Sequence, residues 1–260
     1  MGEKVTTQIS EQTQEGFRIK GFLLEELIGR ISFGDLVYLL MTDNLPTGHE
    51  GQLIEAMLVS CADHGVNAPS ANAARTVASC GVPVSTAVAA GISAIGEYHG
   101  GAGAACAKML QEELSEHKDM TIEEHSEEIF SLYQKAGERI PGLGHRIYKH
   151  VDPRAERLFA VAGKWNLSGK AVSLIKSVAH TWETQTDHHL SINIDGAHGA
   201  LLVDMGIPWQ QAKGLFLIGR AAGLNAHAVE QIISGKPFGF ASPVHAIYTG
   251  PGPRPLADQP

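Results

Sequence analysis

Apolar residues recur at intervals of three and four along most of the chain, and this helical period constrains the fold more than any other feature. In residues 21–41 they form one broad apolar face for each of two predicted helices. Ser32 precedes the second run and Asp35 follows three residues later, which predicts an N-cap with an acidic first turn. The stretch 44–47, which contains a proline, ends that helix, and another begins near Glu50. The pattern favours a helical protein.

Small residues fill the next part of the chain, from Ala71 to Met109. Because small side chains let helices approach closely, we expect tightly packed core helices there, with a break at 81–83. Charged residues crowd 111–128 and predict a solvated segment around a turn. The stretch 190–203 fits a strand or a helix equally well by pattern alone, and a further helix is expected from Trp209 to about Ile233.

The bulk composition excludes several classes of protein. The chain has 260 residues, of which 43% are hydrophobic and 18% charged, as in an ordinary globular protein. Its formal net charge of −8 argues against a nucleic-acid binder. The N-terminus has no apolar core of a secretory signal, and the longest apolar run, 82–95, is too short to span a membrane. We therefore expect a cytoplasmic protein, in which Cys61, Cys80 and Cys106 are small buried residues in a reducing compartment.

Four segments concentrate histidine, arginine and aspartate among glycines, and a fifth places a lone arginine in a very apolar helix. They are 62–65 (ADHG), 99–102 (HGGA), 142–155 (GLGHRIYKHVDPRA), 193–196 (NIDG) and 215–223 (LFLIGRAAG). The lone arginine, Arg220, needs an anion, which is either a protein carboxylate or a ligand, because an unpaired buried charge is costly. Histidines for proton transfer, an aspartate as carbon base and arginines for carboxylates are what enolate chemistry on a polyacid requires.

The segment GLGHRIYKHVDPRA resembles the signature of the citrate synthase family, and the other four segments follow in the family's order. The stretch from Arg18 to Thr47 resembles the family's N-terminal region as well. The resemblance implies an all-α fold, with a large helical domain, a smaller helical domain and the active site in the cleft between them. Residues 1–260 would form one such unit, with 110–205 as the approximate small-domain portion.

The resemblance also implies a role for each site residue. His99 would stabilise the thioester enolate, Asp195 would exchange the proton on the α-carbon, and His145 would exchange the proton on the carbonyl or hydroxyl oxygen. Two further sets of residues are implied. The substrate carboxylates would be held by His64, Arg154 and Arg220, with Phe216 beside them, and CoA would be contacted by the 141–149 loop, through Pro141, Gly142, Leu143, Gly144, Arg146 and Lys149.

Two departures from the synthase pattern indicate a particular branch of the family. The chain is shorter than full-length citrate synthases, and it has Pro243, Val244 and His245 where they carry a basic Arg-Pro-Arg element. Both departures are typical of citryl-CoA lyases and of the C-terminal citryl-CoA lyase module of ATP-citrate lyase. Two stretches of sequence also resemble these proteins more than the synthases, namely NIDGAHGALLVDMG and CADHG-x-NAPS. His99 is nearer to the synthases, because that module lacks a histidine there. The implied reaction is citryl-CoA cleavage to acetyl-CoA and oxaloacetate, with citrate or 2-methylcitrate synthesis as the alternative.

The resemblance implies ligands and partners too. The ligands would be a CoA thioester, as substrate or product, and a di- or tricarboxylate, with no permanently bound cofactor and no metal. The chain would form a homodimer or a larger homo-oligomer, with a citryl-CoA synthetase as a possible partner, and would bind neither nucleic acid nor membrane.

Two alternatives remain open. A metal site built from Asp187, His188, His189, Asp195 and His198 follows no common ligand spacing. A degenerate family member that binds CoA or a partner chain without turnover is the other, although His99, His145 and Asp195 are all intact.

Overall fold

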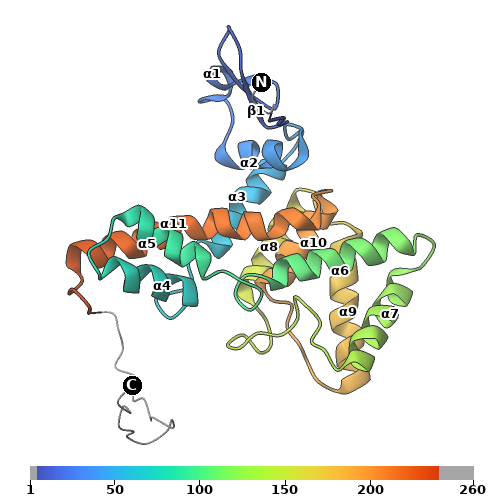
Figure 1. Ribbon diagram of the computed structural model, residues 1–260. Helices are drawn as coiled ribbons and strands as arrows, with labels where there is room; N and C mark the ends of the chain where they lie inside the picture. The colour runs from blue at the N-terminus through green and yellow to red at the C-terminus, as the bar shows by residue number, and fades with distance from the viewer. Residues whose placement is uncertain (1–4, 240–260) are drawn as a thin grey trace, which may run out of the picture.

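Helices make up nearly all of the regular structure in the computed structural model, which describes residues 5–239 (Figure 1). This confirms the predicted all-α class. The helices are α1 (Leu24–Leu27), α2 (Phe33–Thr42), α3 (Glu50–Cys61), α4 (Pro69–Ala78), α5 (Val84–Ser93), α6 (Ala102–Glu116), α7 (Ile122–Ala136), α8 (Pro153–Lys164), α9 (Lys170–Thr186), α10 (Ile194–Asp204) and α11 (Ala212–Ser234). A short 3-10 helix, η1 (Trp209–Gln211), leads into α11.

The N-terminal segment differs from its prediction. It forms a three-stranded antiparallel sheet of β1 (Ser10–Gln12), β2 (Phe17–Ile19) and β3 (Phe22–Leu23), and only the four residues of α1 remain of the first predicted helix. The reason is the turn between β2 and β3. Lys20 and Gly21 both have positive φ, 47° and 87°, which is the backbone of a two-residue hairpin turn. That turn overrides the apolar period that follows it.

The second predicted helix forms as expected. The Ser32 side chain accepts a hydrogen bond from the Asp35 N–H, and the Asp35 carboxylate accepts one from the Ser32 N–H, which is a complete capping box. The helix ends at Asp43, whose backbone is left-handed, and α3 begins at Glu50. Both boundaries lie where the sequence predicts them.

One large core joins α3, α6, α8, α9, α10 and α11. Its fully buried side chains include Leu53, Leu110, Leu174, Leu201 and Leu215. In Figure 1, α6 and α10 lie side by side in the middle of this body, with α7 and α9 beyond them. Because this core extends over α3 and α11 as well as α6–α10, the proposed small-domain portion, 110–205, stays a prediction.

A second, smaller body is built from the small-residue stretch. Helices α4 and α5 pack against each other and against the C-terminal half of α11, through Ala71, Ala74, Ala87, Leu224 and Ala228. Helix α11 therefore runs across both bodies (Figure 1). The breaks between α4 and α5 and between α5 and α6 confirm that this stretch forms close-packed helices rather than one long helix.

The cysteine prediction holds for two of its three residues. Cys61 and Cys106 are buried, but Cys80 is exposed, so its prediction is wrong. The chain turns sharply directly after α4, where Gly81 has a φ of 80°, and this turn leaves Cys80 at the surface. No described helix has both the length and the apolar character needed to cross a membrane. Residues 243–245, where the Arg-Pro-Arg element would fall, and the C-terminal tail lie outside the described residues.

Candidate active site

Asp195 lies in the first turn of α10, close to the first turn of α6. The Asn193 side chain caps α10 by accepting hydrogen bonds from the N–H groups of Asp195 and Gly196, at 3.0 and 3.1 Å. The carboxyl group of Asp195 approaches Gly103, whose backbone provides a hydrogen bond to it. Burial raises the pKa of Asp195, and this outweighs the lowering by Arg154, Arg220 and the Gly103 bond. A raised pKa makes the carboxylate a better carbon base and its acid form more accessible.

His99 precedes α6 and is held by Ser70, at the N-terminal end of α4. The imidazole Nε2 lies 2.8 Å from the Ser70 hydroxyl oxygen and 3.4 Å from the Ser70 backbone nitrogen. A backbone N–H only donates, so Nε2 accepts and the ring proton is on Nδ1. Burial, together with the charge of Arg220 and His64, lowers the pKa of His99. His99 is therefore a neutral hydrogen-bond donor through Nδ1, which suits the oxygen of a developing enolate.

Arg220 is buried in α11, with 4% of its surface exposed. Its Nε donates to the carbonyl oxygen of Cys61 at 2.8 Å, and one terminal nitrogen donates to the Ser70 hydroxyl at 3.3 Å. The guanidinium also lies 4.9 Å from the Phe216 ring centre. Among residues 5–239 it forms no ion pair with a carboxylate, so of the two anions expected for it, the protein carboxylate is excluded there. Of the two alternatives, an anionic ligand stays the expected partner.

The Ser70 hydroxyl links these two groups. Since a guanidinium only donates, the oxygen accepts from Arg220 and its own proton is free for Nε2 of His99. Phe216 packs beside the same pair, with its ring centre 6.2 Å from that of His99 in a T-shaped contact. Sequence reasoning missed Ser70, because a serine in the first turn of a helix is ordinarily only a helix-start signal.

His145 lies in the loop between α7 and α8. Its Nδ1 accepts from the backbone N–H groups of Ile147 and Tyr148, at 3.1 and 3.0 Å, and its ring stacks on Tyr148 with centres 4.8 Å apart. Two N–H donors face Nδ1, and one guanidinium nitrogen of Arg154, also a donor, lies 3.4 Å from Nε2. The two shorter bonds to Nδ1 favour the tautomer that carries the ring proton on Nε2. Burial and the charge of Arg154 lower the pKa of His145. This loop geometry, which the sequence does not reveal, presents a neutral Nε2–H donor.

Arg154 brings the histidines of two segments together. One guanidinium nitrogen lies 3.4 Å from His145 Nε2 and the other 3.5 Å from His64 Nδ1. The two imidazole rings meet edge to face with centres 6.2 Å apart. Burial and the charges of Arg154 and Arg220 lower the pKa of His64. Three predicted carboxylate-binding and proton-transfer residues are thus in mutual contact.

Asp152 holds Arg154 in this position. Its carboxylate accepts two guanidinium hydrogen bonds, at 3.0 and 2.7 Å, together with the backbone N–H of Arg154. The same carboxylate accepts the N–H of Ile194 at 3.2 Å, so it also fixes the start of α10. Sequence reasoning missed this role of Asp152, because the contact with Ile194 spans 42 residues of chain.

Asp152→Asn is expected to lower the free energy of unfolding by about 1.5–3 kcal/mol at neutral pH, since charged hydrogen bonds are lost. Burial raises the pKa of Asp152, but the hydrogen bonds and charge of Arg154 lower it by more, and the net pKa lies below its ordinary value. The contribution is therefore complete above the unfolded pKa of about 4 and is lost as pH falls through the folded pKa. In thermal melts of both proteins from pH 3 to 8, the difference in melting temperature should shrink as the pH falls below about 4; a difference that stays constant down to pH 3 would contradict this account.

The loop predicted to bind CoA is fastened to the segment before α10. Gly144 N donates to Ser191 O at 2.7 Å, and the Asn193 side chain donates to Gly144 O at 2.7 Å. Gly142, with φ of 87°, lies so close to Gly196 that an added Cβ would meet the Gly196 Cα at 2.6 Å. The 190–203 stretch is thus extended at Ile192, which bridges Leu143, and helical from Ile194.

A pocket of about 830 Å³ opens beside this loop. It is lined by Leu143, Gly144, His145, Arg146 and Lys149 of the loop and by residues of α7, α9 and the segment before α10. Arg139 and Trp182 are also in its wall. The pocket thus combines cationic and apolar groups and reaches His145, whereas His99 and Asp195 are not in its lining. Pro141, half-buried, and Gly142, buried, are set back from it.

The residues of the alternative metal site do not gather. His198 is buried against the Ser60 hydroxyl at 2.8 Å, and burial lowers its pKa to about 4. His189 pairs with Glu183 and with the carbonyl oxygen of His150. Within the described part of the chain, the five residues form no group of ligand atoms, so this alternative is wrong there.

Comparison with known families and proteins confirms the predicted citrate synthase-like fold. Residues 47–238 match the family described as "Citrate synthase, C-terminal domain". The "Putative citrate synthase 2" of Mycobacterium tuberculosis is 33% identical over 207 residues, which are 78% of this chain and 52% of that protein. The chain thus spans about half the length of the curated relatives it matches.

Similar solved structures cover more of the chain. The citryl-CoA lyase of Hydrogenobacter thermophilus is 38% identical, with a TM-score of 0.90 over 98% of both chains. The ATP citrate lyase of Methanothrix soehngenii, solved with citrate and coenzyme A, has a TM-score of 0.83 at 23% identity and covers 97% of this chain and 42% of its own. A Thermotoga maritima citrate synthase has a TM-score of 0.61 at 18% identity, over 98% of this chain and 95% of its own. The last two likenesses concern the fold alone.

Proposed function

Because the chain belongs to the citrate synthase family, we propose that it is an enzyme that cleaves citryl-CoA to acetyl-CoA and oxaloacetate. The observation that carries the proposal is the match to a citryl-CoA lyase over 98% of both chains, at 38% identity. That protein has the same compact length as this one. The curated synthases, in contrast, are about twice as long as the segment they share with this chain.

The proposed reaction breaks the bond between the thioester α-carbon and the carbon that carries the hydroxyl. The hydroxyl proton leaves to Nε2 of His145, the new carbonyl forms oxaloacetate, and the bonding electrons pass to the thioester as an enolate. Nδ1–H of His99 donates to the enolate oxygen, and Asp195 in its acid form protonates the carbon to give acetyl-CoA. The raised pKa of Asp195 supports this role.

The proposal places one requirement on His145. As described, Nε2 carries the ring proton, because Nδ1 accepts two backbone N–H groups. That tautomer donates to the carbonyl oxygen of oxaloacetate, the product of cleavage. To accept the hydroxyl proton of citryl-CoA, the ring has to adopt the other tautomer and release the N–H groups of Ile147 and Tyr148.

The remaining predicted residues bind the substrate in this proposal. Arg220 and Arg154 hold the carboxylates of the four-carbon part, with His64 and Phe216 beside them. The 830 Å³ pocket, with Arg146 and Lys149 in its wall, accepts part of CoA and its phosphates. A homodimer or a larger homo-oligomer, and a separate citryl-CoA synthetase that supplies the substrate, belong to the same proposal.

Condensation of an acyl-CoA with a 2-oxo acid is the second candidate. It is supported by the 33% identity to a putative citrate synthase and by the Nε2–H tautomer of His145, which is ready to donate to a ketone.

The two directions are separated by measuring both rates on one preparation. We expect oxaloacetate release from citryl-CoA, without ATP, to be at least about tenfold faster than condensation of acetyl-CoA with oxaloacetate at matched substrate saturation. Oxaloacetate is followed through its reduction by malate dehydrogenase, and condensation through the released thiol of CoA. Faster condensation would reverse the assignment, and the absence of both reactions would favour a protein that only binds CoA.

A further inference from the structure

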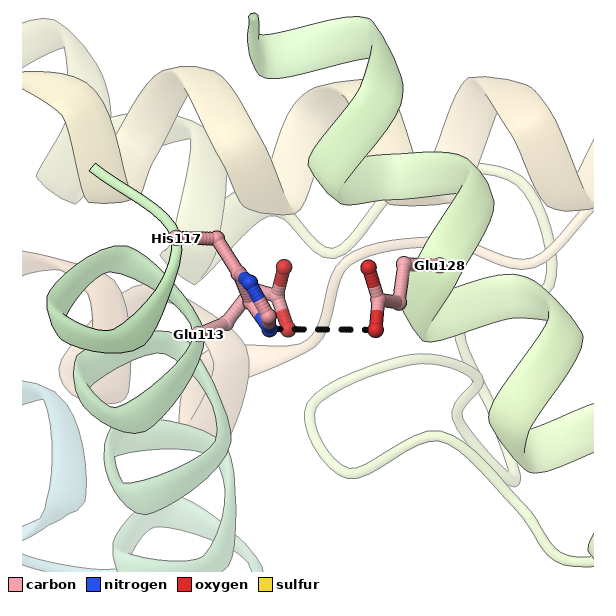
Figure 2. A group of neighbouring side chains, drawn as sticks. All are labelled: Glu113, His117 and Glu128. Atoms are coloured by element: carbon pink, nitrogen blue, oxygen red, sulfur yellow. Dashed lines mark ion pairs between the residues drawn. The ribbon is translucent and has the colours of Figure 1, made fainter. Parts of the chain in front are cut away.

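The C-terminal end of α6 and the facing side of α7 bring an imidazole and two carboxylates together, far from the residues of the candidate active site. Glu113 and His117 are four residues apart on one face, at the end of α6, and Glu128 projects from α7 toward them (Figure 2). One ligand atom from each lies within 4.8 Å of the others, and His117 Nε2 is 3.7 Å from a Glu128 oxygen. Two elements thus converge on one point.

A buried histidine orients this group from behind. His125, in α7, is 3% exposed, and its Nδ1 lies 2.7 Å from Oε1 of Glu113. A carboxylate oxygen only accepts, so the imidazole donates and fixes the Glu113 side chain, of which 12% is exposed. Carboxylates that bind metals are held by such hydrogen bonds from a second layer of residues. The bond also leaves the other oxygen of Glu113 available.

The charges of the group are not balanced. Among residues 5–239, neither Glu113 nor Glu128 pairs with a lysine or an arginine, and their partners are His125 and His117. Two carboxylates thus face one point with no lysine or arginine between them. A divalent ion placed there is attracted by both carboxylates and by the free imidazole nitrogen.

We infer that Glu113, His117 and Glu128 form a binding site for a divalent transition metal ion of the Zn²⁺ class, with water as the fourth ligand. One imidazole nitrogen and two carboxylate oxygens are ligands that Zn²⁺ accepts, whereas Ca²⁺ and Mg²⁺ prefer oxygen alone. Ligands at about 2.0–2.2 Å from a tetrahedral ion lie about 3.4 Å apart. The required closure of about an ångström is available, because the side chains of His117 and Glu128 are 38% and 49% exposed.

A metal ion bound at this site would cross-link α6 and α7 at the turn that joins them. His117 is the C-terminal cap of α6, and Thr121 caps α7, so the ion connects two helices at the point where the chain reverses. Binding to the folded chain alone raises the melting temperature. This inference does not depend on the proposed function.

The test is a Zn²⁺ titration of the full chain after treatment with a chelator. We expect one Zn²⁺ to bind by calorimetry, and the melting temperature to rise by about 5–10 °C when free Zn²⁺ is 100-fold above its Kd. Two variants, His117→Ala and the isosteric Glu128→Gln, should each weaken binding by at least about tenfold. Two matched controls, His188→Ala and Glu127→Gln, remove an exposed side chain of the same kind and should bind as the wild type does.

Three results would overturn the inference. They are no rise in melting temperature at millimolar Zn²⁺, equal binding by Glu128→Gln and Glu127→Gln, and Ca²⁺ binding as tight as that of Zn²⁺. If His117→Ala does not fold, the comparison of Glu128→Gln with Glu127→Gln tests the inference by itself. Both residues are on the surface of α7, and Gln keeps the shape of Glu. The rate of citryl-CoA cleavage is measured on the same samples as a separate readout. Because the metal site is far from the candidate active site, we expect Zn²⁺ to change this rate by no more than about twofold.

Discussion

Asp195→Asn lowers the rate of citryl-CoA cleavage by about 10²- to 10⁴-fold, the range expected when a positioned general acid or base is removed. The amide cannot donate a carboxylic proton to the enolate carbon, but it has nearly the same shape. Because Asn193 caps α10 through backbone N–H groups, the helix start does not depend on the Asp195 carboxyl. The fold should therefore be retained.

Two measurements separate this effect from a general defect. Cleavage is followed as oxaloacetate release, and deuterium uptake into the methyl group of acetyl-CoA, in the presence of oxaloacetate, is followed by NMR. The wild type should exchange and Asp195→Asn should not. Asp187→Asn is the matched control, since residue 187 is an exposed left-handed helix end where asparagine is well tolerated. A rate for Asp195→Asn within threefold of the wild type would remove Asp195 from the mechanism.

Arg220→Met separates activity from stability. The guanidinium is buried without a carboxylate among residues 5–239, so the charge is costly to the protein without its ligand. Methionine of similar length removes that cost, at the loss of the hydrogen bonds to Cys61 O and Ser70. These effects oppose each other, and we expect the free energy of unfolding to stay within about 1 kcal/mol of the wild type. In contrast, kcat/KM should fall by about 10²-fold or more, because a substrate carboxylate loses its buried partner.

The measurements are a denaturant melt and the cleavage rate at several citryl-CoA concentrations. Binding of CoA alone supplies the control, since its proposed contacts lie in the 141–149 loop and should be unchanged. A loss of stability of several kcal/mol with unchanged kcat/KM would show that Arg220 is a structural residue that needs no ligand.

The sequence predicts local features of this fold well where the signal lies within one turn of chain. Ser32 and Asp35 are such a case, because both halves of the capping box are three residues apart. The N-terminal sheet is missed because the left-handed Lys20–Gly21 turn decides the structure, while the apolar run after it fits a helix as well. Cys80 is missed because the same alanine-rich composition continues from the buried face of α4 into an exposed turn.

The candidate site is predictable in its charged and titratable residues but not in the groups that hold them. Arg220 is conspicuous because a lone arginine in an apolar helix demands a partner, and among residues 5–239 the structure gives it no carboxylate in an ion pair. The supporting groups are ordinary when read along the chain. Ser70 lies 150 residues from Arg220, and Asp152 lies 42 residues from Ile194, so only the packing of α4 on α11 and of α8 on α10 reveals their contacts.

The near-contact of Gly142 with Gly196 has a consequence for how such a protein changes over time or in the laboratory. With no room for a methyl group between them, the 141–149 loop and the helix that carries Asp195 are expected to move together. A side chain at either glycine would push the loop and the helix apart, and would so displace both Asp195 and the residues proposed to contact CoA. New acyl selectivity is therefore better sought away from these two glycines, for example at Phe216, which packs beside His99 and Arg220.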